Sequence, residues 1–461
     1  MTSSLDWLPT QELTVTPEDY SLLTDLYQLT MAACYTGEGI EQKHASFELF
    51  TRRLPHNFGY LIAMGLAQAL EYLENLHFST AQIAALKATG IFANVPDRFW
   101  TLLETERFTG DVWAVPEGTA VFANEPLLRV EAPLWQAQLV ETYLLNALNF
   151  QTLVATRAAR SRDVAGQNTT LLEFGTRRAF GPQSSLWAAR AALAAGLDST
   201  SNVLAALHLG SQPSGTMAHS LVMAIAALEG TEDQAFTAFH RYFPGAPVLI
   251  DTYDTVDAAQ RLAQRVKTGE IQLAGVRLDS GDLVKLSKQV RSLLPEVNIF
   301  ASGDLDEWEI AKLKANGAEI DGYGLGTRLV TGTPVNGVYK LVEIEGIGVM
   351  KQSSGKATLP GRKQIFRSFD SNRATIDRLG LVTENPNDAQ PLLQLVMQQG
   401  KRIHHPETIA TIRDRTANSV ASLPNITRRL DNAVSLPVDI SPALQQLTEK
   451  TRIQQGGASV V

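Results

Sequence analysis

The 461-residue chain contains a single cysteine, which excludes an intramolecular disulfide and a zinc site built from several cysteines. A chain without disulfides suits a reducing compartment, so the sequence predicts a cytoplasmic location. Cys34 lies in the apolar segment LTMAACY. This setting predicts a small buried side chain rather than a nucleophile.

Long apolar runs are also missing. The run LVMAIAAL at 221–228 is among the longest, whereas a transmembrane helix needs about 20 such residues. The start MTSSLDWLPTQE has no basic segment followed by an apolar one, so no signal peptide is expected. We therefore expect no membrane partner.

An excess of positive charge is absent as well. The net charge is -8, which argues against a nucleic-acid-binding surface. It does not exclude a small anionic substrate, because charges are screened over about 8 Å and nearby arginines outweigh distant ones. The sequence also lacks the P-loop pattern GxxxxGK[ST] and the metal motif HExxH.

One pattern recurs four times between Val248 and Thr331. An apolar run ends in polar or small residues in VLIDTYDT, AGVRLDSGD, NIFASGDLD and DGYGLGTRLVT. Helix-like segments at 255–269, 282–295 and 304–317 separate the four runs. Repeated strand, loop and helix units predict a parallel α/β sheet. The polar loops then lie together at the carboxyl ends of the strands, where such folds carry their chemistry.

The rest of the chain is mixed. Segment 110–132 is rich in β-branched and aromatic residues with turn signals, which predicts a small antiparallel sheet. Segment 337–353 is again β-like, and the last hundred residues predict two helices. We expect further elements as follows: helices at 21–35, 65–76, 80–88, 133–149 and 156–166, and strands at 46–55 and 169–175.

The segment EFGTRRAFGPQ follows the strand expected at 169–175. The ring of Phe174 can stack on a planar ligand, while Arg177 and Arg178 can hold a carboxylate or phosphate. The alternative is a core phenylalanine beside two surface arginines. Spacing alone does not decide between them.

The segment SGTMAHS places Thr216 and His219 before a helix-like run. The reference pKa of histidine is about 6.5, so at neutral pH its imidazole can act as a nucleophile or base. A lone histidine is more often structural, and that alternative stays open at this point.

The segment VRLDSGD puts Arg277 and Asp279 on the same side of a strand. An arginine beside carboxylates suits a phosphosugar, with arginine on phosphate and carboxylate on a hydroxyl or Mg²⁺. The alternative is an Arg277–Asp279 ion pair with Asp282 as a helix cap. The segments SGDLDE and GLGTR, at 302–307 and 324–328, can cradle phosphate with backbone N–H groups, although glycine also serves ordinary turns.

Together these segments resemble the nicotinate phosphoribosyltransferase family. The resemblance covers most of 20–345 in the family's order. It rests on SLLTDLYQLTM, ASFELFTRRLP, EFGTRRAFG, GTMAHS, DTYDT, GVRLDSGDL, SGDL, GYGLGTRLVT and GVYKL. It implies a type II phosphoribosyltransferase, an α/β protein with an irregular barrel over 146–334. An N-terminal α/β domain over 1–145 and a C-terminal β/α segment over 335–461 that packs back on it complete the expected organisation.

The resemblance also implies the activity. Nicotinate and 5-phosphoribosyl 1-diphosphate give nicotinate mononucleotide and diphosphate, coupled to ATP and with Mg²⁺. This is the entry of nicotinate into NAD biosynthesis. The implied assembly is a homodimer with a shared active site.

The resemblance assigns roles residue by residue. His219 is the residue phosphorylated by ATP, and Asp279 has a catalytic role near the ribose and the pyridine ring. Nicotinate is assigned to Tyr27 of the partner subunit, Phe174, Arg177, Thr216 and Arg277. The phosphosugar is assigned to Asp251, Ser302, Gly303, Asp304, Gly324, Gly326 and Thr327.

Three other functions compete. A nicotinamide phosphoribosyltransferase has similar phosphosugar loops, but a buried carboxylate near its ring substituent would repel nicotinate. A non-catalytic pyridine- or phosphosugar-binding barrel would not need the intact set of His219, Arg277, Asp279 and Tyr27. An aldolase-like barrel usually needs a Schiff-base lysine at the strand ends, and these loops contain none.

Overall fold

The computed structural model describes residues 13–353 and 356–456, which divide into two compact units. Unit 1 comprises 13–152, 334–353, 356–408 and 421–456, and unit 2 comprises 153–333 and 409–420. Within the described ranges, no helix has the length and apolar character needed to cross a membrane.

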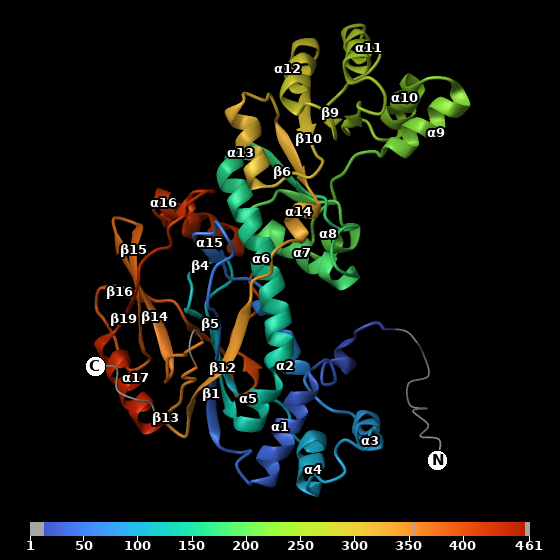
Figure 1. Cartoon of the computed structure of the whole chain (residues 1–461). Helices are drawn as coiled ribbons and strands as arrows, with labels where there is room; N and C mark the ends of the chain where they lie inside the picture. The colour runs from blue at the N-terminus through green and yellow to red at the C-terminus, as the bar shows by residue number, and fades with distance from the viewer. Residues whose placement is uncertain (1–12, 354–355, 457–461) are drawn as a thin grey trace. The chain divides into compact units, whose positions relative to one another are not determined.

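Unit 1 is built on a seven-stranded sheet with the order β13-β12-β1-β5-β3-β17-β18. Its strand β1 (His44–Thr51) pairs antiparallel with β5 (Pro126–Pro133) and with β12 (Gly337–Ile344). The early and late parts of the chain therefore lie side by side in one sheet, blue against orange in Figure 1. All of β1 except His44 is buried, as expected for a central strand covered on both faces.

Helices cover this sheet. Helix α5 (Leu134–Leu139) packs on β1 and β5, and α1 (Leu26–Gly37) packs on α5. The other elements of unit 1 before residue 153 are the 3-10 helix η1 (Pro17–Asp19), α2 (Leu66–Asn75), α3 (Thr80–Ala88), α4 (Asp97–Thr105), β2 (Leu61–Ile62), β3 (Asp111–Ala114), β4 (Ala120–Val121) and the start of α6 (Glu141–Ala165). The helices expected at 65–76 and 80–88 are thus confirmed, as is antiparallel pairing within 110–132, through β3 and β5.

Two expectations at the N-terminus are wrong. The helix expected from Ser21 begins only at Leu26, because the side chains of Asp25 and Thr142 hydrogen-bond to each other (3.0 Å) and the Asp25 backbone stays extended. Cys34 is exposed rather than buried. The buried face of α1 is formed instead by Gln28, Leu29, Ala32, Ala33 and Thr36.

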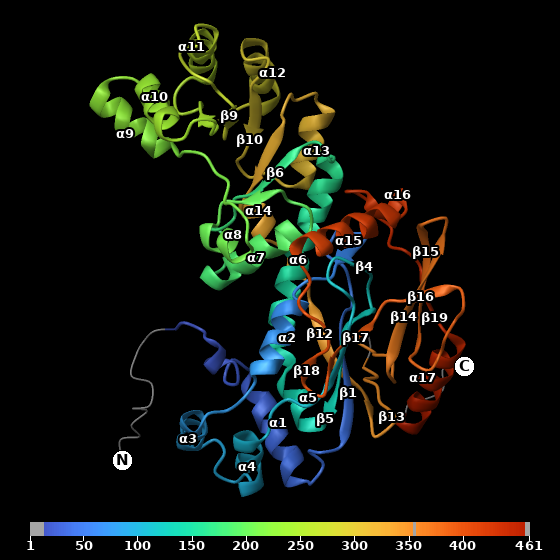
Figure 2. The ribbon, with the colours of Figure 1, turned by 180° about the vertical axis from the view of Figure 1, so that it is seen from behind.

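A four-stranded sheet with the order β16-β14-β15-β19 forms the later part of unit 1. Strand β14 (Lys363–Asp370) pairs with β15 (Arg373–Leu381), and α17 (Pro442–Gln454) packs on β15 (Figures 1 and 2). The remaining elements here are β13 (Ile347–Gly348), β16 (Ala389–Pro391), β17 (Gln394–Gln398), β18 (Lys401–Arg402), α16 (Asn425–Arg428) and β19 (Val438–Ile440). The two helices expected near the end are confirmed, whereas the sheet was not foreseen.

Unit 2 is built on a six-stranded sheet in which every pair is parallel, so the predicted parallel sheet is confirmed. Its strands run in the order β7-β6-β11-β10-β9-β8. They are β6 (Thr170–Glu173), β7 (Ser199–Thr200), β8 (Val248–Leu249), β9 (Gly275–Leu278), β10 (Asn298–Ala301) and β11 (Gly322–Leu325).

The helices between these strands are also confirmed. Helices α11 (Thr255–Lys267), α12 (Leu283–Leu293) and α13 (Glu307–Ala315) begin after the capping residues Asp254, Asp282 and Asp306, whose side chains accept backbone N–H bonds. Figure 2 shows α11 and α12 side by side. The other helices of unit 2 are the rest of α6 from residue 153, α7 (Pro182–Ala194), α8 (Val203–His208), α9 (His219–Glu229), α10 (Glu232–Tyr242), α14 (Thr327–Val330) and most of α15 (Ile409–Ser422).

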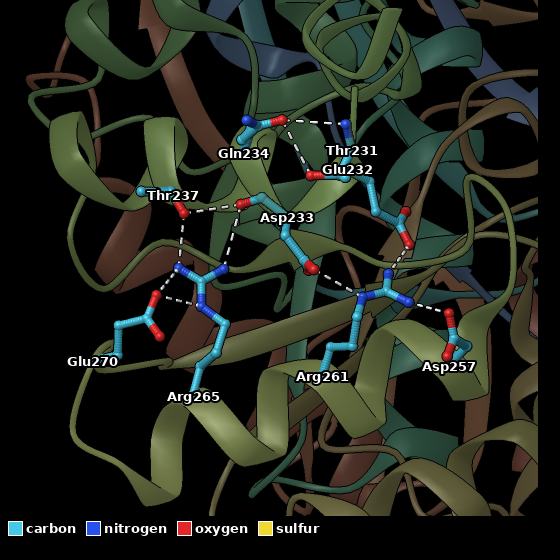
Figure 3. A network of polar contacts seen from close by, with 9 residues as sticks. All are labelled: Thr231, Glu232, Asp233, Gln234, Thr237, Asp257, Arg261, Arg265 and Glu270. Atoms are coloured by element: carbon cyan, nitrogen blue, oxygen red, sulfur yellow. Dashed lines mark hydrogen bonds and ion pairs between the residues drawn. The ribbon is translucent and has the colours of Figure 1, made fainter. Parts of the chain in front are cut away.

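An ionic network joins α10 to α11 (Figure 3). The guanidinium of Arg261 pairs with Glu232, with Asp233 at 2.9 Å and with Asp257. Arg265 pairs with Glu270 at 2.7 Å. The side chain of Glu232 is only 7% exposed, so its carboxylate depends on Arg261 for compensation.

We expect Arg261→Met to destabilise unit 2, because the mutation leaves the Glu232 carboxylate buried without a cation. The cost should be about 1–3 kcal/mol, since the network is only partly buried. Urea unfolding followed by circular dichroism measures it. Arg241→Met is the control, at an exposed arginine on α10 that forms no ion pair with any described residue. Equal midpoints for the two variants would contradict this role of Arg261.

Candidate active site

All but one of the predicted site residues lie in unit 2. Most are at or just after the carboxyl ends of its parallel strands, whereas Thr216 and His219 lie in the loop before α9 and at its start. The exception is Tyr27, which lies on α1 in unit 1 and is 46% exposed. Partial burial and the nearby carboxylates of Glu141 and Asp25 raise the pKa of Tyr27 to about 12. This phenol is therefore neutral at physiological pH and can act as a hydrogen-bond donor.

The chain turns sharply after β6 at Phe174. The backbone N–H of Phe174 donates to the carbonyl of Leu325 at the end of β11 (2.7 Å). A Cβ placed on Gly324 would lie 2.5 Å from the Phe174 ring and 3.3 Å from the Cβ of Ser302. The absence of a side chain at Gly324 thus lets the Phe174 ring lie against the ends of β10 and β11.

Thr216 and Arg277 both bond to the loop that precedes α9. The Thr216 hydroxyl donates to the carbonyl of Pro247 (2.8 Å) and accepts the N–H of Met217 (2.6 Å). The guanidinium of Arg277, on β9, donates to the carbonyl of Met217 (3.2 Å). These bonds bring the predicted residues of two motifs together.

Arg277 has donors left over. Its Nε is buried and has no hydrogen-bond partner among the described residues. Burial lowers the pKa of Arg277, the nearby Asp279 and Asp251 carboxylates oppose this shift, and the Arg177 charge adds to it. The ion pair between Arg277 and Asp279, considered as a structural alternative, does not form in the described ranges. A partly buried cation with a free, buried N–H next to a second arginine favours an anionic ligand.

His219, the first residue of α9, lies between two side chains from the loop after β8. Its Nδ1 is 3.0 Å from the hydroxyl of Thr252, and its Nε2 is 3.9 Å from the carboxylate of Asp251. The side chain of His219 is 39% exposed, so the imidazole is held in place yet reachable. This environment fits a nucleophile better than a core histidine.

Asp251 and Asp279 form a connected pair of carboxylates. Asp251 Oδ2 accepts from the backbone N–H of Asp279 (2.9 Å) and from the hydroxyl of Ser280 (2.7 Å). Its Oδ1 is buried without a hydrogen-bond partner in the part of the chain that the structure describes. Asp279 Oδ1 accepts from the Ser302 hydroxyl, which links β9 to β10. Asp282 caps α12, so for this residue the structural alternative holds.

The two small-residue loops follow β10 and β11. Gly303 and Asp304 both have positive φ, 94° and 46°, so the first loop turns sharply beside Asp279. Gly326 and Thr327 open the second loop and the short helix α14. The side chain of Arg328 bonds to Asp306 at 2.9 Å, which ties one loop to the other.

Sequence reasoning missed several residues of this site. Thr252 contacts His219, and Ser280 donates a hydrogen bond to Asp251. At the turn around Phe174, the Glu173 carboxylate accepts hydrogen bonds from Thr200 and Gly175. Thr252 and Ser280 stand inside motifs that were recognised, so a search of every polar residue at the strand ends would have found them. The partner of Glu173 lies 27 residues away, and no local signal marks it.

The arrangement suits a small anionic aromatic compound and a phosphorylated one. It offers an aromatic ring, two arginines, two linked carboxylates and two small-residue loops. In the described ranges, no three His, Cys, Asp or Glu side chains form a group able to hold a metal by themselves. A Mg²⁺ ion usually needs only one or two carboxylates when substrate phosphates and water complete its shell, and Asp251 Oδ1 fits such a ligand.

Comparisons with known proteins agree on one family. Residues 22–149 match the model of the nicotinate phosphoribosyltransferase N-terminal domain, 169–302 the family model, and 381–448 the C-terminal domain. A Mycobacterium tuberculosis protein, nicotinate phosphoribosyltransferase pncB2, is 42% identical over 435 residues, which cover 91% of each chain. A nicotinate phosphoribosyltransferase of Bacillus subtilis is 38% identical over 488 residues, covering 95% of this chain and 97% of that one.

A solved structure agrees as well. The crystal structure of human nicotinic acid phosphoribosyltransferase superposes with a TM-score of 0.80 at 31% identity. The match covers 93% of this chain and 99% of the human one. The mixed α/β fold is therefore shared with a solved structure over nearly the whole chain.

Proposed function

Because the chain belongs to the nicotinate phosphoribosyltransferase family and is an enzyme of this type, we propose that the strand ends of unit 2 bind its two substrates. The reaction joins nicotinate to 5-phosphoribosyl 1-diphosphate. The pyridine nitrogen forms a bond to C1 of the ribose, the C1–oxygen bond to diphosphate breaks, and nicotinate mononucleotide results. The product is a precursor in NAD biosynthesis.

The nicotinate site is the part with the strongest support. Phe174 stacks on one face of the pyridine ring, and Tyr27 of the partner subunit covers the other face. Arg277, with Arg177 and Thr216 nearby, binds the carboxylate. The observation that carries this proposal is the partly buried Arg277 guanidinium, whose buried Nε has no hydrogen-bond partner and which forms no ion pair among the described residues.

The phosphosugar site lies next to it in the proposal. The residues assigned to it are Asp251, Ser302, Gly303, Asp304, Gly324, Gly326 and Thr327. Asp279 adjoins the ribose, where positive charge develops at C1, and its carboxylate stabilises that charge. The pyridine nitrogen needs no deprotonation, so the protein mainly positions the substrates and stabilises charge. Bound Mg²⁺ supplies neutralisation of the diphosphate charge, and Asp251 is the residue that would hold it.

ATP enters through His219. We propose that the imidazole takes the γ-phosphoryl group, with a P–N bond formed and ADP released, and that water later removes the phosphoryl group. The new charge of about −2 lies beside Asp251 and the loop that carries Thr252. Added charge there reorders neighbouring groups and changes substrate affinity.

The proposal also includes the fold of unit 2, the oligomeric state and the cellular location. Unit 2 is an irregular α/β barrel, since its strands follow chain order from β8 to β11 and then continue to β6 and β7. The enzyme is a homodimer in which Tyr27 reaches the site from a second copy, as the family resemblance implies. The cytoplasm is the location that its single cysteine favours.

Product analysis tests the proposal directly. The purified enzyme is incubated with 5-phosphoribosyl 1-diphosphate and either nicotinate or nicotinamide, with and without ATP. We expect nicotinate mononucleotide as the main product and a higher rate with ATP. Turnover of nicotinamide alone would overturn the substrate assignment, and turnover of neither would favour a binding protein.

We expect His219→Ala to keep a basal activity without ATP and to lose the stimulation by ATP. The mutation removes the phosphoryl acceptor but leaves Phe174 and Arg277 in place. Steady-state rates with and without ATP, together with ³²P transfer from γ-labelled ATP, measure the effect. His208→Ala, at an exposed histidine on α8, is the control. Full ATP stimulation in the His219→Ala variant would contradict the phosphohistidine proposal.

A further inference from the structure

Glu173, the last residue of β6, carries a carboxylate that the proposed reaction does not use. Its side chain is fully buried (0% exposed). Nowhere in residues 13–353 and 356–456 does a lysine or arginine form an ion pair with it. A buried carboxylate without a cation is costly unless hydrogen bonds satisfy both oxygens.

Hydrogen bonds do satisfy both oxygens of Glu173. The backbone N–H of Gly175 donates to Oε1, and the hydroxyl of Thr200 donates to Oε2. Thr200, at the end of β7, is itself fully buried, and its oxygen accepts the N–H of Asn202 (2.9 Å). Burial raises the pKa of Glu173, and these two bonds oppose that shift. The carboxylate therefore links the ends of two parallel strands.

The bond from Gly175 to Glu173 spans one residue, Phe174. This bond closes a tight turn whose central side chain is the aromatic ring. Three further features hold the turn in place. The Phe174 N–H donates to the Leu325 carbonyl, and the Phe174 ring lies against Gly324. Gly175 packs closely on the Val330 side chain, since a Cβ added to this glycine would come well under 3.0 Å from it. These contacts hold the backbone or one face of the Phe174 ring. The Glu173 carboxylate holds together the two residues on either side of Phe174, because it accepts the Gly175 N–H.

We propose that Glu173 is a positioning residue for nicotinate, which acts by holding the Phe174 ring in its stacking orientation through Gly175 and Thr200. The inference rests on the proposed stacking role of Phe174. It assigns specificity for the aromatic substrate to the buried Glu173–Thr200 hydrogen bond between β6 and β7, which touches no substrate. If this hydrogen bond were merely structural, its loss would lower stability and change the KM values of the two substrates by equal factors.

Thr200→Val tests this inference, because valine keeps the shape and removes the hydroxyl, both as the donor to Glu173 and as the acceptor of the Asn202 N–H. We expect the KM for nicotinate to rise about tenfold, as for loss of a hydrogen bond to a charged group. The KM for 5-phosphoribosyl 1-diphosphate and kcat should stay within about twofold. Thr200→Ser keeps the donor and should restore the wild-type KM. Glu173→Gln, which loses the charge and keeps the shape, should raise the same KM by a smaller factor.

Phe174→Ala and the double variant Phe174→Ala with Thr200→Val separate the two proposals. If Phe174→Ala leaves the KM for nicotinate unchanged, the stacking proposal fails, and the inference about Glu173 fails with it. If Phe174→Ala raises this KM and Thr200→Val does not, only the inference about Glu173 is overturned. A rise of both KM values by equal factors in Thr200→Val also overturns it. A double variant no worse than Phe174→Ala alone supports action through the ring.

Discussion

Gly303→Ala is expected to lower kcat/KM for 5-phosphoribosyl 1-diphosphate by a factor of about one hundred or more. Gly303 has a φ of 94°, a conformation that costs an L-residue roughly 1–2 kcal/mol. A Cβ there would also come well under 3.0 Å from the backbone oxygen of Asp279. Because that neighbour is rigid backbone, either the loop after β10 or the end of β9 must move.

Both of these segments carry residues assigned to the substrate. A displaced loop shifts the N–H groups proposed to hold phosphate, and a shifted Asp279 also loses its bond from Ser302. Catalysis depends on the exact positions of the groups that bind the phosphoryl and ribosyl parts of the substrate. A displacement of these binding groups by about 1 Å is therefore enough for a loss of this size. Steady-state kinetics with varied phosphoribosyl diphosphate, together with the melting temperature, measure the outcome.

Gly230→Ala is the matched control for this prediction. Gly230 caps α9 with a φ of 98°, but a Cβ there would meet no atom within 4 Å. This variant carries the same backbone strain without the collision, and we expect lower stability with kinetics close to wild type. The role of close packing at Gly303 would be refuted by equal kinetic constants in the two variants.

Sequence alone predicted the alternation of strands and helices in unit 2 because the signals there are local. Asp254, Asp282 and Asp306 each stand just before an apolar-periodic segment and cap the helix that follows. The apolar runs are short and buried, as parallel strands are. The residues that line the strand ends could therefore be identified as a group.

The contacts within that group could not be predicted, because they depend on the register of neighbouring strands. His219 and Thr252 are 33 residues apart, and Glu173 and Thr200 are 27 apart. The sheet of β14 and β15 was missed for another reason. Its buried face includes an ion pair between Arg367 and Asp377, and these charges hide the alternation by which strands are recognised.

We expect Arg277→Met to lower kcat/KM for nicotinate by about a hundredfold or more, and by much less for nicotinamide. Nicotinate carries a carboxylate that Arg277 can bind with charge-assisted hydrogen bonds, whereas the neutral amide of nicotinamide gains less from a cation. Hydrogen bonds to charged groups contribute about 1.5–3 kcal/mol each, and 1.4 kcal/mol corresponds to a factor of ten. Two such bonds therefore account for the expected loss.

Two further variants make the Arg277 prediction specific. Arg277→Lys keeps the positive charge but loses the planar fork, so an intermediate loss of about tenfold is expected. Arg241→Met removes an exposed arginine of α10 to which no substrate role is assigned and should leave both substrates unaffected. The preference for nicotinate over nicotinamide is the decisive quantity, because Arg277 also bonds to Met217 and its loss disturbs that loop for either substrate. An unchanged preference for nicotinate over nicotinamide in Arg277→Met would show that this guanidinium supports the loop and does not bind the nicotinate carboxylate.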